Sequence, residues 1–148
     1  MISLKTEVQK HGYKMIAWVI LDNHYHFLFR TIKSGYLSKM INQVHGFVSY
    51  QLNKINKTPG RKIFQNYWDR CMRDEADFWR RFNYIHHNPV KHGYVSRMED
   101  YEFSSYNYWL KRKGKEWLNS CFETYPIIDY TPNKGNQPKA EVRGVIKN

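Results

Sequence analysis

The feature that most constrains the fold is a change in hydrophobic period between residues 31 and 37. Two runs dense in aromatic and β-branched residues come first, at 13–21 and 24–31, and such runs predict β-strands. Asp22 and Asn23 lie between them, and this pair tolerates the backbone of a tight turn. From 37 to 52 the apolar residues recur at three- and four-residue steps, which predicts an amphipathic helix. The simplest interpretation is an antiparallel hairpin followed by a helix.

A second helix is predicted further along the chain. Residues 54–62 are basic and contain a Pro-Gly pair, which favours an exposed loop, and residues 63–72 fit either a strand or the approach to a helix. Asp74 is a typical N-cap residue, and the apolar residues after it recur at helical spacing. We expect this helix to end near Asn88, because Pro89 follows.

Order signals weaken in the last part of the chain. They fade after Trp117, and residues 130–148 are polar and contain two prolines. Such a composition predicts a loosely held tail. The sequence shows no internal repeat and no convincing second domain, and its 148 residues suffice for one domain with a core.

The charge of the chain points to an anionic partner. It carries 24 Lys and Arg residues against 13 Asp and Glu residues, a formal net charge of +11, and nucleic acid is the most plausible partner for such an excess. Mean hydropathy is −0.78, and no apolar run approaches the roughly 20 residues of a membrane span. We therefore expect no membrane partner and a cytoplasmic location. Cys71 and Cys121 lack the spacing of a zinc knuckle or a disulfide framework.

The sharpest chemical signal is the segment His24-Tyr25-His26. On a strand, residues two apart share a face and lie about 7 Å apart along the backbone. Two imidazoles at that spacing can converge on one divalent cation, so His24 and His26 are candidate metal ligands. The alternative is that one or both histidines are packed or solvated.

Tyr67 is a candidate nucleophile. A tyrosine hydroxyl has a pKa of about 10 and attacks poorly unless a cation or a positive field activates its target. Where a metal polarises a phosphodiester, a tyrosine can attack phosphorus and conserve the bond energy as a phosphotyrosine. The chain contains 12 tyrosines, so a packing role is the alternative for any one of them.

The block 84–95 contains His86, His87 and His92. A second metal site could be built from these three residues. They flank the predicted end of a helix and face different ways, so we favour a structural role for this block.

Basic residues spread through the middle of the chain are candidate DNA contacts. Lys and Arg neutralise phosphates, and the Tyr and Trp residues interleaved with them can stack on unpaired bases of single-stranded nucleic acid. A solvated charged face is the alternative. The candidates are Arg61, Lys62, Arg70, Arg73, Arg80, Arg81 and Lys91.

Three ordered blocks of the sequence resemble the small single-tyrosine HUH transposases. Residues 18–28, WVILDNHYHFL, look like the strand-turn-strand segment of that family. Residues 67–75, YWDRCMRDE, and 84–95, YIHHNPVKHGYV, resemble two further blocks typical of the REP-associated tyrosine transposases. The resemblance covers residues 13–110, and the order of the three blocks makes it specific.

The resemblance implies a ferredoxin-like α+β fold, with an antiparallel sheet and helices on one face, in a homodimer. It implies an enzyme that binds hairpin-bearing single-stranded DNA and cleaves and rejoins it. His24 and His26 match the pair that binds Mg²⁺ or Mn²⁺, and Tyr67 matches the nucleophile that becomes linked to the 5′ side of the break. The transposase-like domain is expected over residues 1–110, with a basic, partly ordered extension over 111–148.

The chain departs from the family pattern at two places. Family members carry a strand and a helix upstream of the hairpin, and we expect these to be missing or incomplete here. Arg70 stands where relatives often have His, which leaves the third metal ligand open. Tyr84 is a second candidate nucleophile, ranked below Tyr67.

Two other functions are alternatives to the transposase. An inactive or domesticated relative that only binds DNA is the alternative. A metal-dependent hydrolase of small molecules is disfavoured, because the apolar residues 27–29 follow the histidine pair where such sites usually add a carboxylate.

Overall fold

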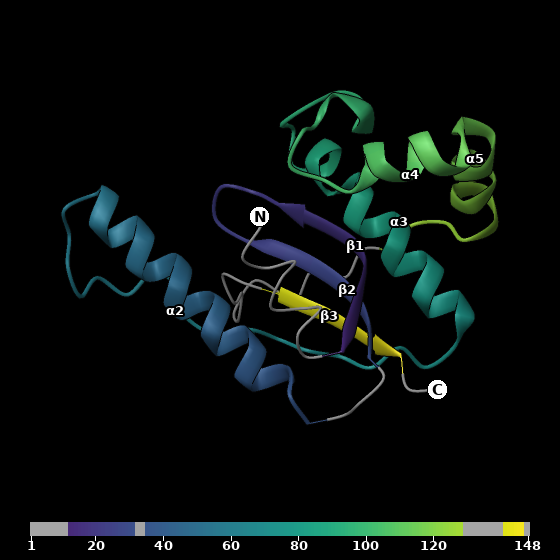
Figure 1. Ribbon diagram of the computed structural model, residues 1–148. Helices are drawn as coiled ribbons and strands as arrows, with labels where there is room; N and C mark the ends of the chain where they lie inside the picture. The colour runs from purple at the N-terminus through teal and green to yellow at the C-terminus, as the bar shows by residue number, and fades with distance from the viewer. Residues whose placement is uncertain (1–11, 32–34, 129–140, 147–148) are drawn as a thin grey trace.

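A computed structural model describes residues 12–31, 35–128 and 141–146 (Figure 1). Strands β1 (Tyr13–Ile20) and β2 (Tyr25–Thr31) pair antiparallel, so the predicted hairpin is confirmed. Strand β3 (Glu141–Ile146) pairs parallel to β2 on its other side, giving the order β1-β2-β3. The expectation of a loosely held tail is therefore wrong for β3, because a strand edge leaves backbone N–H and C=O groups that a further strand can pair. The expected lack of a first strand and helix concerns residues 1–11, outside the described residues.

The helices lie where local sequence patterns place them. Helix α2 (Leu37–Ile55) contains the predicted stretch, and α3 (Glu75–Lys91) begins at the predicted cap, where the side chain of Asp74 accepts a hydrogen bond of 2.7 Å from Asp77 N. Three shorter elements follow: η1 (Met98–Asp100), α4 (Tyr106–Lys113) and α5 (Lys115–Thr124). Within the described residues, no helix is long and apolar enough to cross a bilayer.

Helix α3 continues through Pro89, so its predicted end near Asn88 is wrong. A proline inside a helix removes one backbone N–H, and here the lost partner is the carbonyl of Ile85. The loss falls in the last turn, where the helix still closes with hydrogen bonds of 3.0 Å from His92 N to Asn88 O and from Gly93 N to Val90 O. The consequence is an additional helical turn that carries His92 to its end.

An irregularity in strand β1 changes which side chains face each side of the sheet. The register shifts between Met15 and Ala17. Before the shift, Tyr13 points to the side covered by α2; after it, Trp18 points there, while Val19 points to the side covered by α3. One extra residue in a strand has this effect because side chains alternate with a period of two.

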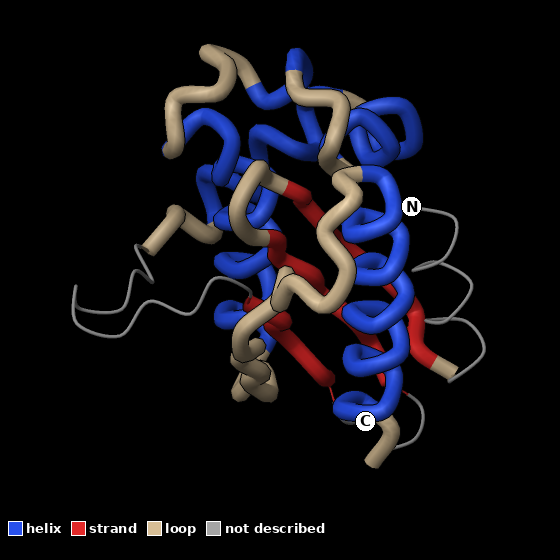
Figure 2. The backbone as a smooth tube through the Cα atoms, turned by 90° about the vertical axis from the view of Figure 1, so that its left-hand side faces the viewer, coloured by secondary structure: helices blue, strands red, loops and turns tan. Residues whose placement is uncertain are grey.

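Helices cover both faces of the sheet, rather than the one face that was expected, while the α+β class is confirmed (Figure 2). Strand β2 has buried side chains on both sides, so each side needs a cover. The α2-side cluster consists of Tyr13, Tyr25, Phe27, Phe29, Met40, Ile41 and Val44. The α3-side cluster consists of Ala17, Val19, Leu21, Leu28, Phe82, Ile85, Tyr106 and Leu118.

Residues after position 110 contribute to this packing. The boundary expected there falls inside α4. Leu118 of α5 is fully buried in the α3-side cluster, and Trp109 of α4 donates a hydrogen bond of 2.8 Å to the carbonyl of Ile16. Helix α5 therefore packs against the core through Trp117, Leu118 and Phe122.

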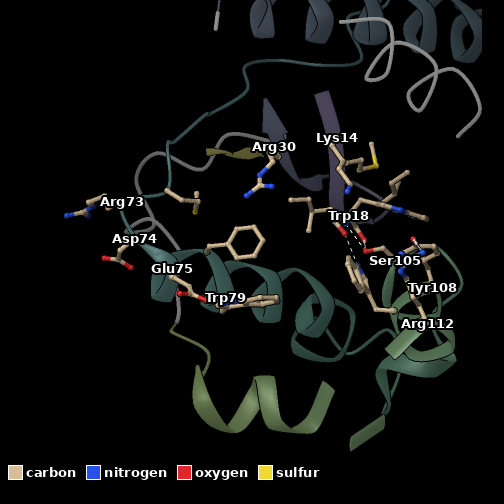
Figure 3. A pocket seen from close by; sticks show the side chains of 16 residues that line it. Lys14, Trp18, Arg30, Arg73, Asp74, Glu75, Trp79, Ser105, Tyr108 and Arg112 are labelled. Carbon is tan, nitrogen blue, oxygen red and sulfur yellow. Dashed lines mark hydrogen bonds between the residues drawn. The ribbon is translucent and has the colours of Figure 1, made fainter. Parts of the chain in front are cut away.

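A cavity of about 890 Å³ opens between β1, the start of α3 and α4 (Figure 3). Its walls combine basic side chains with aromatic rings. It lies beside the α3-side cluster, because Ile16, Phe78 and Trp109 belong to its lining and also pack against that cluster.

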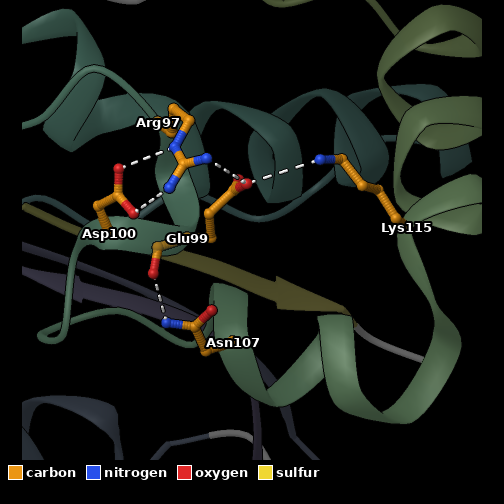
Figure 4. A network of polar contacts seen from close by, with 5 residues as sticks. All are labelled: Arg97, Glu99, Asp100, Asn107 and Lys115. Atoms are coloured by element: carbon orange, nitrogen blue, oxygen red, sulfur yellow. Dashed lines mark hydrogen bonds and ion pairs between the residues drawn. The ribbon is translucent and has the colours of Figure 1, made fainter.

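A polar network joins η1 to the two C-terminal helices (Figure 4). Arg97 pairs with Asp100 at 2.8 Å, and Lys115 pairs with Glu99 at 3.6 Å. The carbonyl of Glu99 also accepts a hydrogen bond of 2.9 Å from Asn107. The network links η1 to α4 and α5, and its exposed ion pairs contribute little to stability.

Candidate active site

The two histidines of the HYH segment lie together at the start of β2. Their rings meet edge-on with centroids 5.1 Å apart, so the predicted shared face is found. His26 is buried and His24 is half-buried. Tyr25, which lies between them, points to the α2-side cluster, so the histidine pair faces the side of the sheet that α3 covers.

The ring of His24 is oriented by the turn that precedes it. Its Nδ1 lies 2.5 Å from Asn23 Oδ1. An amide oxygen only accepts hydrogen bonds, so Nδ1 carries the proton and Nε2 keeps its lone pair. Burial, followed by the nearby charges of His26 and His92, lowers the pKa of His24 to about 4. His24 is therefore neutral at pH 7, in the form that binds metals.

Helix α3 brings three side chains to the histidine pair from one of its faces. Tyr84, Asn88 and His92 follow one another at four-residue steps, which places them above one another on a helix. The ring of Tyr84 lies 5.6 Å from that of His26, and the ring of His92 lies 5.1 Å from that of His24. The buried side chain of Asn88 lies close enough to His24 to raise the pKa of that imidazole, against the larger effect of burial.

Tyr84 occupies a protected position with a positive charge beside it. Its side chain is 5% exposed, and Lys91 Nζ lies 5.1 Å from the centre of its ring. Lys91 was a predicted DNA contact, and it is itself exposed. A phenol beside an exposed ammonium group is suited to meet a phosphate.

Tyr67 lies on the opposite side of the sheet from the histidine pair. It packs against the α2-side cluster, and its hydroxyl donates a hydrogen bond of 2.6 Å to Ser38 Oγ. The expectation that Tyr67 works with His24 and His26 is therefore corrected, because strand alternation points those histidines toward α3.

The other histidines of the 84–95 block divide into two groups. His86 is fully buried and hydrogen-bonds to Ser105 Oγ at 2.7 Å, and burial lowers its pKa to about 3. This confirms the structural interpretation for His86. His92 differs, because the last turn of α3 carries it to His24. The four-residue spacing of Tyr84, Asn88 and His92 is the sequence signal for this arrangement. The helix end predicted near Asn88 hides that signal, because it leaves His92 outside the helix.

The possible ligand atoms beside the histidine pair are nitrogen and oxygen atoms, a mixture that fits a divalent cation. Among the described residues, no three His, Cys, Asp or Glu side chains are grouped to hold a metal ion. The donors available are the imidazoles of His24 and His26 and the amide oxygen of Asn88. Imidazole nitrogen together with amide oxygen is a donor set that could hold a divalent cation.

The predicted DNA contacts differ in their exposure. Arg80 is half-buried, and Arg81 is 2% exposed and pairs with Asp77 at 3.4 Å. The prediction that Arg81 contacts DNA is therefore wrong. A buried guanidinium without a carboxylate partner is strongly destabilising, and Arg81 is held within α3 by its pairing with Asp77. The exposed candidates are Arg61, Lys62, Arg70, Arg73 and Lys91.

Two proteins of known name are similar to the chain in sequence. No family model matches the chain. A protein of Haemophilus influenzae named as a REP-associated tyrosine transposase is 28% identical over 153 residues, which cover 96% of this chain and 78% of that protein. The chain is similar in sequence to the REP-associated tyrosine transposases. A REP-associated tyrosine transposase of Escherichia coli K12 is 28% identical over 98 residues, and the match spans 55% of its length and 64% of this chain.

A solved structure is similar to the chain in fold. The structure of a REP-associated tyrosine transposase bound to a REP hairpin matches it with a TM-score of 0.58, covering 92% of this chain and 76% of the other. At 18% identity the match concerns the fold. It agrees with the α+β class described above.

Proposed function

We propose that the chain is a transposase-type enzyme that binds hairpin-bearing single-stranded DNA and cleaves and rejoins it through a phosphotyrosine at Tyr84. The observation that carries the proposal is the ring of Tyr84 beside His26, which in turn meets His24. The names of the relatives, tyrosine transposase, agree with this chemistry. The binding of a REP hairpin by the matching structure supports the choice of DNA substrate.

The reaction transfers a phosphodiester to Tyr84 and back. The hydroxyl oxygen attacks the scissile phosphorus, a bond forms between Tyr84 Oη and phosphorus, and the bond from phosphorus to the 3′ oxygen breaks. The proton leaves Tyr84, and the departing 3′ oxygen gains one, giving a free 3′-OH. Attack of a 3′-OH on the phosphotyrosine reverses these steps and rejoins the strand. Lys91, beside the ring of Tyr84, is positioned to attract the phosphate.

His24, His26 and the amide oxygen of Asn88 would hold a divalent cation, Mg²⁺ or Mn²⁺. When bound, such a cation supplies polarisation of the phosphodiester. Asn23 keeps the Nε2 lone pair of His24 available by accepting a hydrogen bond from Nδ1–H. The low pKa of His24 keeps the imidazole neutral.

A covalent adduct between protein and DNA tests the proposal. Purified protein is mixed with labelled hairpin-bearing single-stranded DNA and Mn²⁺, then resolved on a denaturing gel. We expect an adduct with the wild type and with Tyr67→Phe, and none with Tyr84→Phe. Tyr67→Phe is the matched control, since it also removes a tyrosine hydroxyl, but on the opposite face of the sheet. An adduct that survives Tyr84→Phe would overturn the assignment of Tyr84.

Two further outcomes concern the activity and the assembly. Hairpin binding by the wild type with no adduct would favour the alternative, a relative that only binds DNA. The homodimer stays a prediction, and light scattering would support it with a mass of twice 18.0 kDa.

A further inference from the structure

Two basic side chains that line the cavity of Figure 3 lie opposite each other on the two strands of the hairpin. Lys14 of β1 and Arg30 of β2 are direct partners in the antiparallel register. Like charges at opposed positions destabilise a sheet. Both side chains are exposed, and the guanidinium of Arg30 extends toward the middle of the cavity. Across the described residues, neither takes part in an ion pair. An anion between them would stabilise both.

The two acidic residues of the lining are already engaged by α3. Asp74 caps the helix through a hydrogen bond of 2.7 Å from Asp77 N. Glu75 accepts a hydrogen bond of 3.1 Å from the indole N–H of Trp79. Lys14, Arg30 and Arg112 line the same cavity, so the lining favours a ligand with negative charge.

Aromatic rings line the cavity beside these cations. Tyr108 is 55% exposed, and the guanidinium of Arg112 lies 6.0 Å from the centre of its ring. Arg112 also donates a hydrogen bond of 3.3 Å to the hydroxyl of Tyr108, which holds the ring in place. An exposed ring next to cations is the combination that binds single-stranded nucleic acid, with bases stacked on the ring and phosphates on the cations.

The cavity lies on the same side of the sheet as the histidine pair. His26 and Arg30 are four residues apart on β2 and share a face. Their backbones are therefore separated by about 13 Å. We propose that the cavity binds an unpaired stretch of the DNA strand and leads it to Tyr84. This rests on the proposed function, since the occupant is a segment of the same DNA.

Binding of two hairpin probes tests the cation pair. One probe is a fluorescent hairpin with a single-stranded oligothymidine extension, and the other is the same hairpin without it. For Lys14→Ala/Arg30→Ala we expect at least tenfold weaker binding of the extended probe and unchanged binding of the blunt one. The slope of log affinity against log salt for the extended probe should become shallower by about 1.4, the contribution of two phosphates on a single strand.

Matched variants separate the cavity from general charge. Lys39→Ala/Lys54→Ala removes two exposed cations from α2 and should leave the preference for the extended probe unchanged. Tyr108→Ala should weaken binding of the extended probe about 5- to 100-fold, as expected for loss of stacking on one base. Tyr50→Ala removes a ring that is 64% exposed on α2 and should have no effect. Thermal unfolding of each variant checks that it is folded.

The outcomes separate this inference from the proposed function. Equal losses for both probes, or no loss in either cavity variant, would overturn the cavity as a single-strand site. A lost preference for the extension in the cavity variants would support the site even if the wild type formed no adduct. An adduct with an intact preference in the cavity variants would uphold the enzyme and reject the site.

Discussion

The ring of Tyr84 meets the ring of His26 edge-on, with centroids 5.6 Å apart and planes at 75°. The two residues come from α3 and β2, elements separated by α2 and a long loop. Their contact depends on the side of the sheet to which His26 points. A phenol and an imidazole in this arrangement are the parts from which the proposed cleavage chemistry is built.

Asn23→Ala should weaken metal binding while leaving the fold intact. Loss of the 2.5 Å contact to Nδ1 frees the ring of His24 to rotate and to change tautomer. Loss of such an orienting partner typically lowers metal affinity 10- to 100-fold, and we expect about that effect. Calorimetric titration with Mn²⁺ measures it, with Asn42→Ala on the exposed side of α2 as control. Equal affinities for the two variants would contradict the orienting role of Asn23.

Tyr67→Phe should affect stability rather than cleavage. The substitution removes the hydrogen bond to Ser38, which is worth about 1 kcal/mol of unfolding free energy or less. Ser38→Ala should cause a similar loss, and the double variant should lose less than the sum of the two. Urea unfolding measures these differences. A loss in the double variant equal to the sum would mean that the two hydroxyls act independently.

Asp74→Ala should destabilise α3 from its first turn. The side chain of Asp74 satisfies the backbone N–H of Asp77, and loss of such a cap costs about 1 kcal/mol. Asp69→Ala, in the exposed loop before the helix, removes the same charge without a cap and serves as control. Chemical unfolding of both variants compares them, and equal stabilities would reject the cap as a stabilising contact.

The free energy of unfolding should decrease as the pH is lowered below about 6.5, in part because of His86. Burial lowers the pKa of His86 from 6.5 to about 3 in the folded chain. Between these values the unfolded chain binds the proton and the folded chain does not, so acid favours unfolding. The slope contributed by this residue approaches about 1.4 kcal/mol per pH unit.

His86→Gln tests that contribution, since glutamine can keep a hydrogen bond to Ser105 and does not titrate. Urea unfolding at neutral pH and near pH 5 should show a smaller loss on acidification for the variant than for the wild type. His24, with its pKa lowered to about 4, contributes in the same direction and stays in both proteins. Identical losses would mean that His86 is not protected from protons in the folded chain.

The hairpin, α2 and the start of α3 could be predicted because local patterns determine them. The Asp22-Asn23 turn, the apolar period of 37–52 and the cap at Asp74 each act over a few residues. The histidine pair could be identified for the same reason, since a strand places residues two apart on one face. The resemblance to a family added the order of the blocks.

The choice between Tyr67 and Tyr84 could not be made from those patterns. It depends on which helix covers the face of β2 that carries His26, and that packing joins residues far apart in the chain. Pro89 indicates a helix end in the sequence, but a proline in the last turn removes only one hydrogen bond, and α3 continues through it. The pairing of β3 with β2 was similarly non-local, since the two strands lie more than 100 residues apart.

One rigid helix links the proposed strand-binding cavity to the tyrosine. Phe78 lines the cavity and Tyr84 lies six residues later on α3, a rise of about 9 Å. Because a helix is rigid, α3 would keep the distance between the cavity and Tyr84 constant and would act as a molecular ruler. The cut would fall at a constant number of nucleotides from the segment held in the cavity, whatever the bases in between, and the position of the break would be counted by the protein rather than read from the sequence at the break.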